Sequence, residues 1–172
     1  LQRDMLSSRL QMGHKLLFFP EGTSTDGRQV LPFKSTLFAA LFEQNLKSDI
    51  YVVFGSSYIK GEPVDFLVEK KTINIHMGVS PYYRGCDCNF WALYDDNPHL
   101  VGATIHMLSK GLDSGPMLYH AMSNIKSTPF EYTMSTVKSA FHSITERIKD
   151  KSIFKIEPAV QDKSKEIRYS KK

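Results

Sequence analysis

Short apolar segments separated by turn residues recur along the chain and predict the strands of a sheet. The segment DIYVVF is rich in β-branched and aromatic residues and alternates little, as expected of a strand that is buried on both faces. Gly55 ends it. The predicted strands comprise residues 16–19, 49–54, 72–75, 101–108 and 117–122.

Helical periodicity is clearest between residues 128 and 148. The run Thr128-Pro129-Phe130-Glu131 has the pattern of a capping box with proline at the first helical position. Shorter helices are predicted at residues 1–15 and 35–46. The apolar stripe of the long helix is predicted to consist of Phe130, Met134, Val137, Phe141, Ile144 and Ile148. Alternating strands and helices predict an α/β fold with three layers and a mainly parallel sheet.

Composition limits the class of protein. The chain has 172 residues, of which 41% are hydrophobic and 23% charged, as is typical of a soluble globular domain, alone or with a fragment of another. No run of about 18 apolar residues occurs, so no membrane-spanning helix is predicted. The first residues lack the apolar core and cleavage site of a signal peptide, and the start at Leu1 suggests truncation upstream.

Charge and cysteine content add two expectations. The net charge is +4, and residues 162–172 are basic. We expect this tail to be solvated and mobile, with contact to RNA or another polyanion as the alternative. Cys86 and Cys88 form a C-x-C step, in which a disulfide would be strained and two thiolates would make a poor zinc site, so we expect no bound metal. Reduced cysteines agree with a cytoplasmic location.

Three side chains on two segments have the chemistry that acyl transfer to an amine needs. Asn74 and His76 are two residues apart at the end of a predicted strand, so both can face one side. Asp113 lies in a glycine-flanked loop after another strand, where α/β sheets form ligand sites. An amide can donate to an oxyanion, an imidazole can transfer protons near neutral pH, and a carboxylate can orient the imidazole. Each also has a structural explanation when taken singly, and His106, in the middle of a strand, is expected to be a packed structural histidine.

The ordered motifs INIH, PYYRG, TIHM and GLDSGP resemble those of the folate-dependent formyltransferases, which include methionyl-tRNA formyltransferase and the sugar-amine formyltransferases. The resemblance covers about residues 49–170 and implies a catalytic domain at 49–160, followed by the tail from residue 161. It implies that Asn74, His76 and Asp113 are catalytic. The implied formyl donor is 10-formyltetrahydrofolate, and the implied acceptor is an amine on methionyl-tRNA or on an amino sugar.

The resemblance also implies where the donor binds. One wall of its pocket would be formed by Phe54, Gly55, Ser56, Ser57 and Tyr58, and the other by Lys110, Gly111 and Leu112. The family has further strands and helices upstream, so the sheet of the formyltransferase type is expected to be incomplete in its N-terminal half. We expect no counterpart in this sequence of the domain by which the methionyl-tRNA enzyme binds tRNA, so tRNA is a candidate acceptor without its usual binding domain.

Residues 18–38, FFPEGTSTDGRQVLPFKSTLF, resemble a second family, the glycerolipid acyltransferases that act on 1-acylglycerol-3-phosphate. This resemblance implies an acyltransferase-like fragment at residues 1–48. Its phosphate-binding loop would include Glu21, Gly22, Thr23 and Lys34. The catalytic N-H-x-x-x-x-D block of that family does not occur before residue 18, so we predict no acyl transfer.

The two resemblances meet near residues 46–52, which predicts a fused or truncated product of two genes. Two alternatives to formyl transfer therefore remain open. One is a glycerolipid acyltransferase fragment that acts at a membrane surface, and the other is an inactive chimeric fragment.

Overall fold

A four-stranded mixed sheet forms the centre of the protein. The computed structural model describes residues 2–12, 49–56 and 58–170. The strands follow the order β1 (Val52–Phe54), β2 (Ile73–His76), β4 (Gly102–Met107) and β5 (Met117–Met122). These four strands confirm the predicted strands from residue 49 onward.

The strand directions differ from the expected mainly parallel sheet. β1 pairs with β2 in parallel, whereas β2 with β4 and β4 with β5 pair antiparallel. A short loop at residues 108–116 joins β4 to β5, and a connection of this kind returns the chain antiparallel to the strand it has left. The α/β class is confirmed, and the described part of its sheet is mixed.

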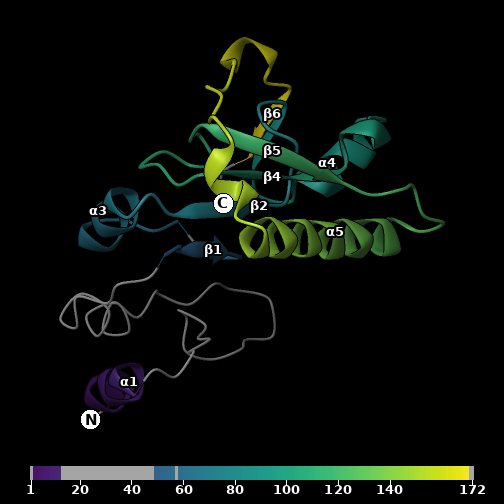
Figure 1. Cartoon of the computed structure of the whole chain (residues 1–172). Coiled ribbons are helices and arrows are strands. Elements are labelled where there is room, and N and C mark those ends of the chain that lie inside the picture. The colour runs from purple at the N-terminus through teal and green to yellow at the C-terminus, as the bar shows by residue number, and fades with distance from the viewer. Residues whose placement is uncertain (1, 13–48, 57, 171–172) are drawn as a thin grey trace.

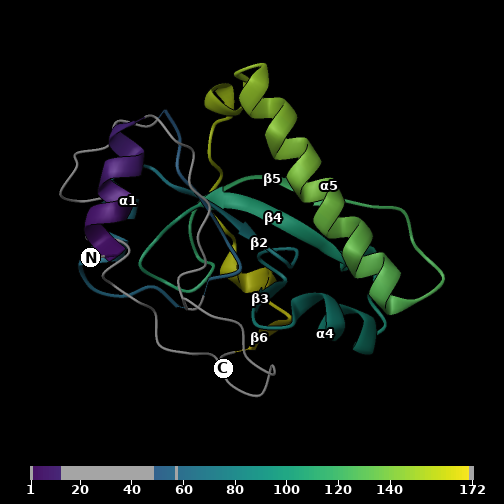
Figure 2. The ribbon, with the colours of Figure 1, turned by 90° about the horizontal axis from the view of Figure 1, so that it is seen from below.

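One face of the sheet is covered by α5 (Pro129–Lys149), which crosses the strands in Figure 2. Thr128 caps this helix, because its side chain accepts a hydrogen bond from the N–H of Glu131 at 3.2 Å. The predicted helix is thereby confirmed. The core between helix and sheet consists of Ile73, Ile75, Ala103, Ile105, Ala121, Ala140, Ile144 and Ile153.

The side of α5 that packs against the sheet matches the predicted stripe only near the end of the helix, at Ile144 and Ile148. The buried positions recur every four residues, at Tyr132, Thr136, Ala140 and Ile144. Phe130, by contrast, is 73% exposed, and Met134 and Phe141 are exposed as well. Small side chains at Thr136 and Ala140 let the helix lie close to the sheet, which the larger apolar residues would prevent.

The opposite face of the sheet is covered by the chain that leads from β2 to β4. This segment contains β3 (Tyr83–Gly85) and α4 (Cys88–Tyr94). Thr104 on β4 holds it in place, since its hydroxyl donates to the carbonyl of Gly78 at 2.6 Å and accepts from the N–H of Ser80 at 2.8 Å.

β3 also pairs in parallel with β6 (Arg168–Ser170), and the two form a second, two-stranded sheet. Residues 161–170, expected to be a mobile tail, therefore contribute a strand to the fold. Sequence patterns identified neither of these strands, because each has only three residues and finds its partner far along the chain.

The remaining elements are short. Figure 1 shows α3 and α4 near opposite ends of the sheet. The helix predicted at residues 1–15 is present as α1, whereas the strand at 16–19 and the helix at 35–46 lie outside the described residues. No helix among the described residues is long and apolar enough to cross a membrane. The bounds are Gln2–Gln11 for α1, Glu62–Glu69 for α3, and Pro98–Leu100, Ser152–Lys155 and Lys163–Lys165 for three 3₁₀ turns.

Candidate active site

A cavity of about 1130 Å³ is lined by residues of β1, β2 and β4, by the loops that follow these strands, and by Thr133 of α5. Ile73 and Ile75 of β2 point into the core against α5, so the alternating residues Asn74 and His76 point to the other face. Both line the cavity, together with His106 from β4 and Asp113 from the loop between β4 and β5. The structure thus brings the three predicted catalytic residues together and adds a second histidine.

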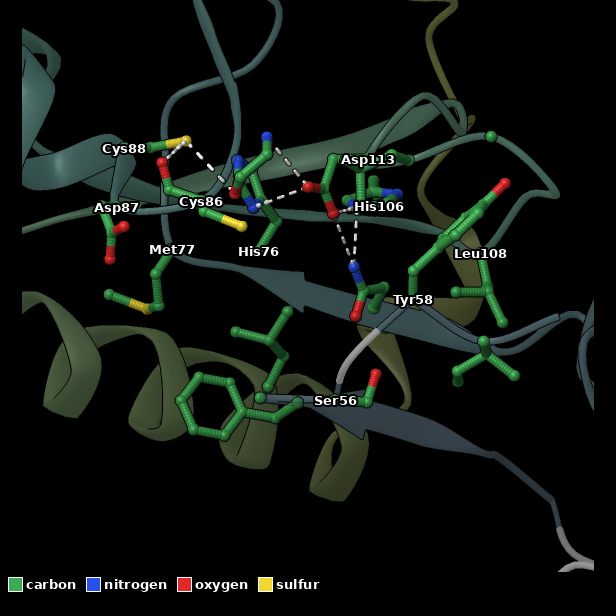
Figure 3. A pocket seen from close by; sticks show the side chains of 18 of the residues that line it. Ser56, Tyr58, His76, Met77, Cys86, Asp87, Cys88, His106, Leu108 and Asp113 are labelled. Atoms are coloured by element: carbon green, nitrogen blue, oxygen red, sulfur yellow. Dashed lines mark hydrogen bonds and ion pairs between the residues drawn. The ribbon is translucent and has the colours of Figure 1, made fainter. Parts of the chain in front are cut away.

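Asp113 is the centre of this cluster. One carboxylate oxygen, Oδ2, accepts a hydrogen bond from the N–H of Gly85 at 3.1 Å and lies 3.3 Å from Nδ1 of His76. The other oxygen, Oδ1, accepts from the side-chain amide of Asn74 at 3.3 Å. Figure 3 shows the carboxylate close to both His76 and His106. The loop delivers Asp113 in a left-handed conformation, with φ of 46°.

His106 belongs to the same cluster and is not merely a packed histidine. Its Nδ1 lies 2.8 Å from the carbonyl oxygen of Met107, which can only accept, so Nδ1 carries the proton. In the neutral ring Nε2 is then an acceptor, and the amide of Asn74 donates to it at 3.0 Å. Asn74 therefore directs one amide hydrogen to His106 and the other to Asp113.

The protonation of the pair His76 and Asp113 follows from its surroundings. Burial lowers the pKa of His76, although the Asp113 carboxylate and a hydrogen bond to the Tyr83 carbonyl oppose that change. Burial disfavours the charged form of Asp113, but the neighbouring imidazoles of His106 and His76 and the hydrogen bond from the Gly85 N–H together lower the pKa of its carboxyl group. At neutral pH the cluster therefore combines a neutral His76 with an ionised Asp113.

In its neutral form, the His76 ring has one N–H proton but two hydrogen-bond acceptors beside it. Its Nε2 lies 3.1 Å from the Tyr83 carbonyl oxygen, and its Nδ1 faces the Asp113 carboxylate. A neutral ring can donate to only one of them, whereas an imidazolium would donate to both. The site is consequently built to stabilise a second proton on His76 when that proton arrives.

Most of the predicted donor pocket lines the same cavity, namely Phe54, Gly55, Ser56, Tyr58, Gly111 and Leu112. Ser57 lies outside the described residues. Lys110 is not part of the wall: its ammonium pairs with Asp65 at 2.6 Å, and only its carbonyl oxygen approaches the pocket, where the Tyr58 hydroxyl donates to it at 2.6 Å. Ile59, Val64 and Leu108 add an apolar wall that sequence reasoning missed.

The other end of the cavity is lined by Met77, Cys86, Asp87 and Phe90, several of which Figure 3 labels. Cys86 and Cys88 are free thiols, and burial raises the pKa of Cys88. The predicted phosphate-binding residues Glu21, Gly22, Thr23 and Lys34 lie outside the described residues.

Two groups of the backbone complete the site, the carbonyl of Tyr83 and the N–H of Gly85. Both belong to the PYYRG motif, so the sequence contained a signal for them. Backbone groups, however, carry no residue-type signature. Their roles therefore emerge only from the geometry.

Comparison with known proteins identifies a family. Residues 36–149 match the family described as formyl transferase. A methionyl-tRNA formyltransferase from Caldanaerobacter subterraneus subsp. tengcongensis is 33% identical over 111 residues, which cover 62% of this chain and 36% of that protein. The one from Thermosynechococcus vestitus is 35% identical over 75 residues, covering 44% and 22%. The chain thus spans at most about a third of the length of these curated relatives.

The second resemblance is confirmed over a short stretch. A lyso-ornithine lipid O-acyltransferase from Rhodobacter capsulatus is 64% identical over 45 residues, which cover 26% of this chain and 16% of that protein. One chain therefore matches proteins of two different families.

Solved structures show the same fold. The formyltransferase PseJ from Anoxybacillus kamchatkensis superposes with a TM-score of 0.59 at 23% identity, covering 94% of this chain and 76% of that one. An N-formyltransferase from Helicobacter canadensis gives a TM-score of 0.54 at 19% identity, covering 95% and 64%. At these identities the likeness concerns the fold alone.

Proposed function

Because the chain belongs to the formyl transferase family, we propose that it transfers a formyl group from 10-formyltetrahydrofolate to an amine acceptor. The observation that carries the proposal is the convergence of Asn74, His76 and Asp113 at one cavity, where Asn74 and His76 each lie within hydrogen-bonding distance of Asp113. We further propose that residues 49–160 are the catalytic unit and that residues 1–48 are a separate, acyltransferase-like piece.

The proton chemistry centres on His76. When the acceptor amine attacks the formyl carbon, the amine must lose a proton and the departing nitrogen must gain one. The Asp113 carboxylate can accept the proton of the amine and pass it to Nδ1 of the neutral His76, 3.3 Å away. The imidazolium that forms pairs with Asp113 and returns the proton by the same route to the departing nitrogen. The Tyr83 carbonyl, 3.1 Å from Nε2, accepts from the other nitrogen and fixes the ring.

Asn74 is proposed to stabilise the negative oxygen that develops on the formyl carbon. Both of its amide hydrogens are directed to neighbours, His106 and Asp113. The contact to Asp113 is the longer of the two, at 3.3 Å against 3.0 Å. We therefore expect the formyl oxygen to take the place of Asp113 as the acceptor, while His106 keeps the amide in orientation.

The cavity suits a folate donor in size and chemistry. Tyr58, Ile59, Val64 and Leu108 give an aromatic and apolar wall, and the polar cluster around Asp113 lies on the same cavity. Such a wall fits a flat heteroaromatic ring whose formyl group is presented to the polar cluster. The two solved relatives support a folate, since one is in complex with tetrahydrofolate and the other with folinic acid.

The acceptor is proposed only as an amine. The Helicobacter canadensis structure includes dTDP-3-aminofucose, and the curated relatives are methionyl-tRNA formyltransferases. Either class presents a primary amine to the cluster. The acyltransferase match covers 16% of the protein concerned and supports no second activity here.

The test measures tetrahydrofolate release by the purified chain, supplied with 10-formyltetrahydrofolate and either dTDP-3-aminofucose or methionyl-tRNA. His76→Gln and Asp113→Asn should each lower turnover by about 10²- to 10⁴-fold. His142→Gln, at an exposed position of α5, is the matched control and should keep wild-type turnover. In parallel, folinic acid should raise the melting temperature. Absence of both turnover and folate-dependent stabilisation would refute the proposal.

A further inference from the structure

The segment at residues 159–170 lies beyond the part of the chain that matches the family, yet it contacts both walls of the active site. On the Asp113 side, the side-chain amide of Gln161 donates to the backbone carbonyls of Asp113 and Gly115, at 2.8 and 2.7 Å. Next to it, Ala159 and Met117 exchange two backbone hydrogen bonds of 2.7 and 2.8 Å. The segment thereby holds the loop that carries Asp113 in place.

On the other side, the same segment supports β3. The N–H of Ile167 donates to the carbonyl of Tyr82 at 2.9 Å, and β6 continues the pairing along β3. The guanidinium of Arg84 also donates to Glu166, with Nε at 2.8 Å. β3 supplies the Tyr83 carbonyl that faces His76 and the Gly85 N–H that binds Asp113. One segment therefore fixes both partners of the His76–Asp113 pair.

From this geometry we propose that Gln161 is a positioning residue for formyl transfer, which holds Asp113 at His76 through the backbone of the loop. The proposal rests on the function proposed above. Gln161 is only 7% exposed, and its amide binds two carbonyls within three residues of the loop. Asp113 has a positive φ in this loop, and the two hydrogen bonds from Gln161 support the loop in that conformation. Removing the amide removes that support and leaves both carbonyls without this donor.

The test uses the full chain with Gln161→Met, which keeps the length and apolar bulk of the side chain but has no donor. We expect kcat to fall by about 100-fold, since a displacement of about 1 Å at a catalytic group has an effect of that size. KM for the folate donor should stay unchanged, because Gln161 does not line the cavity. NMR titration of the histidine side chains should show that His76 titrates at lower pH than in wild type, because Asp113 moves away from it. The His76 signal is assigned by its loss in His76→Gln.

Ser164→Ala is the matched control in the same segment, because the Ser164 hydroxyl donates to Asp162 in its own turn, at 2.6 Å. It should change neither kcat nor the titration of His76. If Gln161→Met does not fold, Gln161→Leu is used, a second apolar side chain that cannot donate to the carbonyls. Failure of both variants to fold overturns the proposal, since Gln161 would then act on the fold.

Unchanged titration of His76 in a folded Gln161 variant also overturns it, whatever the activity. If the wild-type chain transfers no formyl group, the proposed function fails by itself. The NMR titration then still decides whether Gln161 positions Asp113 against His76.

Discussion

Gly78 lies directly beside the imidazole of His76, and Gly78→Ala is the most local way to disturb it. A Cβ atom at this position would lie 2.5 Å from Nε2 of His76 and 2.5 Å from Cβ of Cys88. Neither neighbour is the free end of a flexible chain, because His76 is buried and the Cβ of Cys88 is attached to the backbone of α4. An ordinary contact needs about 3.5 Å, so one neighbour must move by about 1 Å.

The size of the effect follows from that displacement. Overpacking of this kind costs about 1–3 kcal/mol of folding free energy. For a protein of this length that corresponds to a melting temperature lower by about 2–12 °C. If His76 moves, the hydrogen bond between Nε2 and the Tyr83 carbonyl is lost, and turnover should fall by about 100-fold.

The assay combines thermal melting with tetrahydrofolate release at 25 °C. Gly102→Ala is the matched control, because its Cβ would meet Val79 and the sulfur of Met122, each at 2.6 Å, and would not approach His76. It should lower the melting temperature and leave turnover per folded molecule unchanged. A Gly78→Ala protein with wild-type turnover and melting temperature would show that the space beside His76 is not restricted as described.

Three further outcomes are expected. His106→Phe removes an acceptor of the Asn74 amide and should lower kcat by about tenfold; unchanged kcat contradicts a role in orienting Asn74. Burial lowers the pKa of His76 in the folded state below the ordinary value of 6.5. As the pH is lowered through 6.5, the unfolded chain therefore binds up to one proton more than the folded chain, and the free energy of unfolding falls by at most about 1.4 kcal/mol per pH unit. His76→Gln should weaken the dependence of the melting temperature on pH in this range. A dependence equal to that of the wild type would contradict a buried, neutral His76 ring. Iodoacetamide at pH 8 should alkylate Cys86 alone in the folded protein, because Cys88 is 2% exposed and burial raises the pKa of its thiol; mass spectrometry should find a second adduct only after unfolding.

Sequence patterns predicted the features of this structure that depend on residues close together in the chain. Residues two apart in a strand share a face whatever the fold, so Asn74 and His76 could be placed together from the sequence. The capping box located the start of α5 to within one residue, since Thr128 and Glu131 satisfy each other.

The errors come from contacts between distant residues. Two overlapping stripes run along α5. The stripe with the small residues Thr136 and Ala140 is buried against the sheet, whereas Phe130 of the other stripe is exposed. The link between His106 and Asn74 depends on the register of β2 against β4, which no local motif encodes. Gln161 acts through backbone carbonyls, so no spacing of side chains pointed to it.

The pairing of β3 with β6 has a practical consequence for anyone who shortens this chain. The match to the family ends at residue 149, but the last described strand ends at Ser170. A protein that ends at residue 149 would lack β6 and so expose the edge of β3. It would also lack Glu166, the ion-pair partner of Arg84. Where homology stops is thus a poor guide to where this protein can be cut.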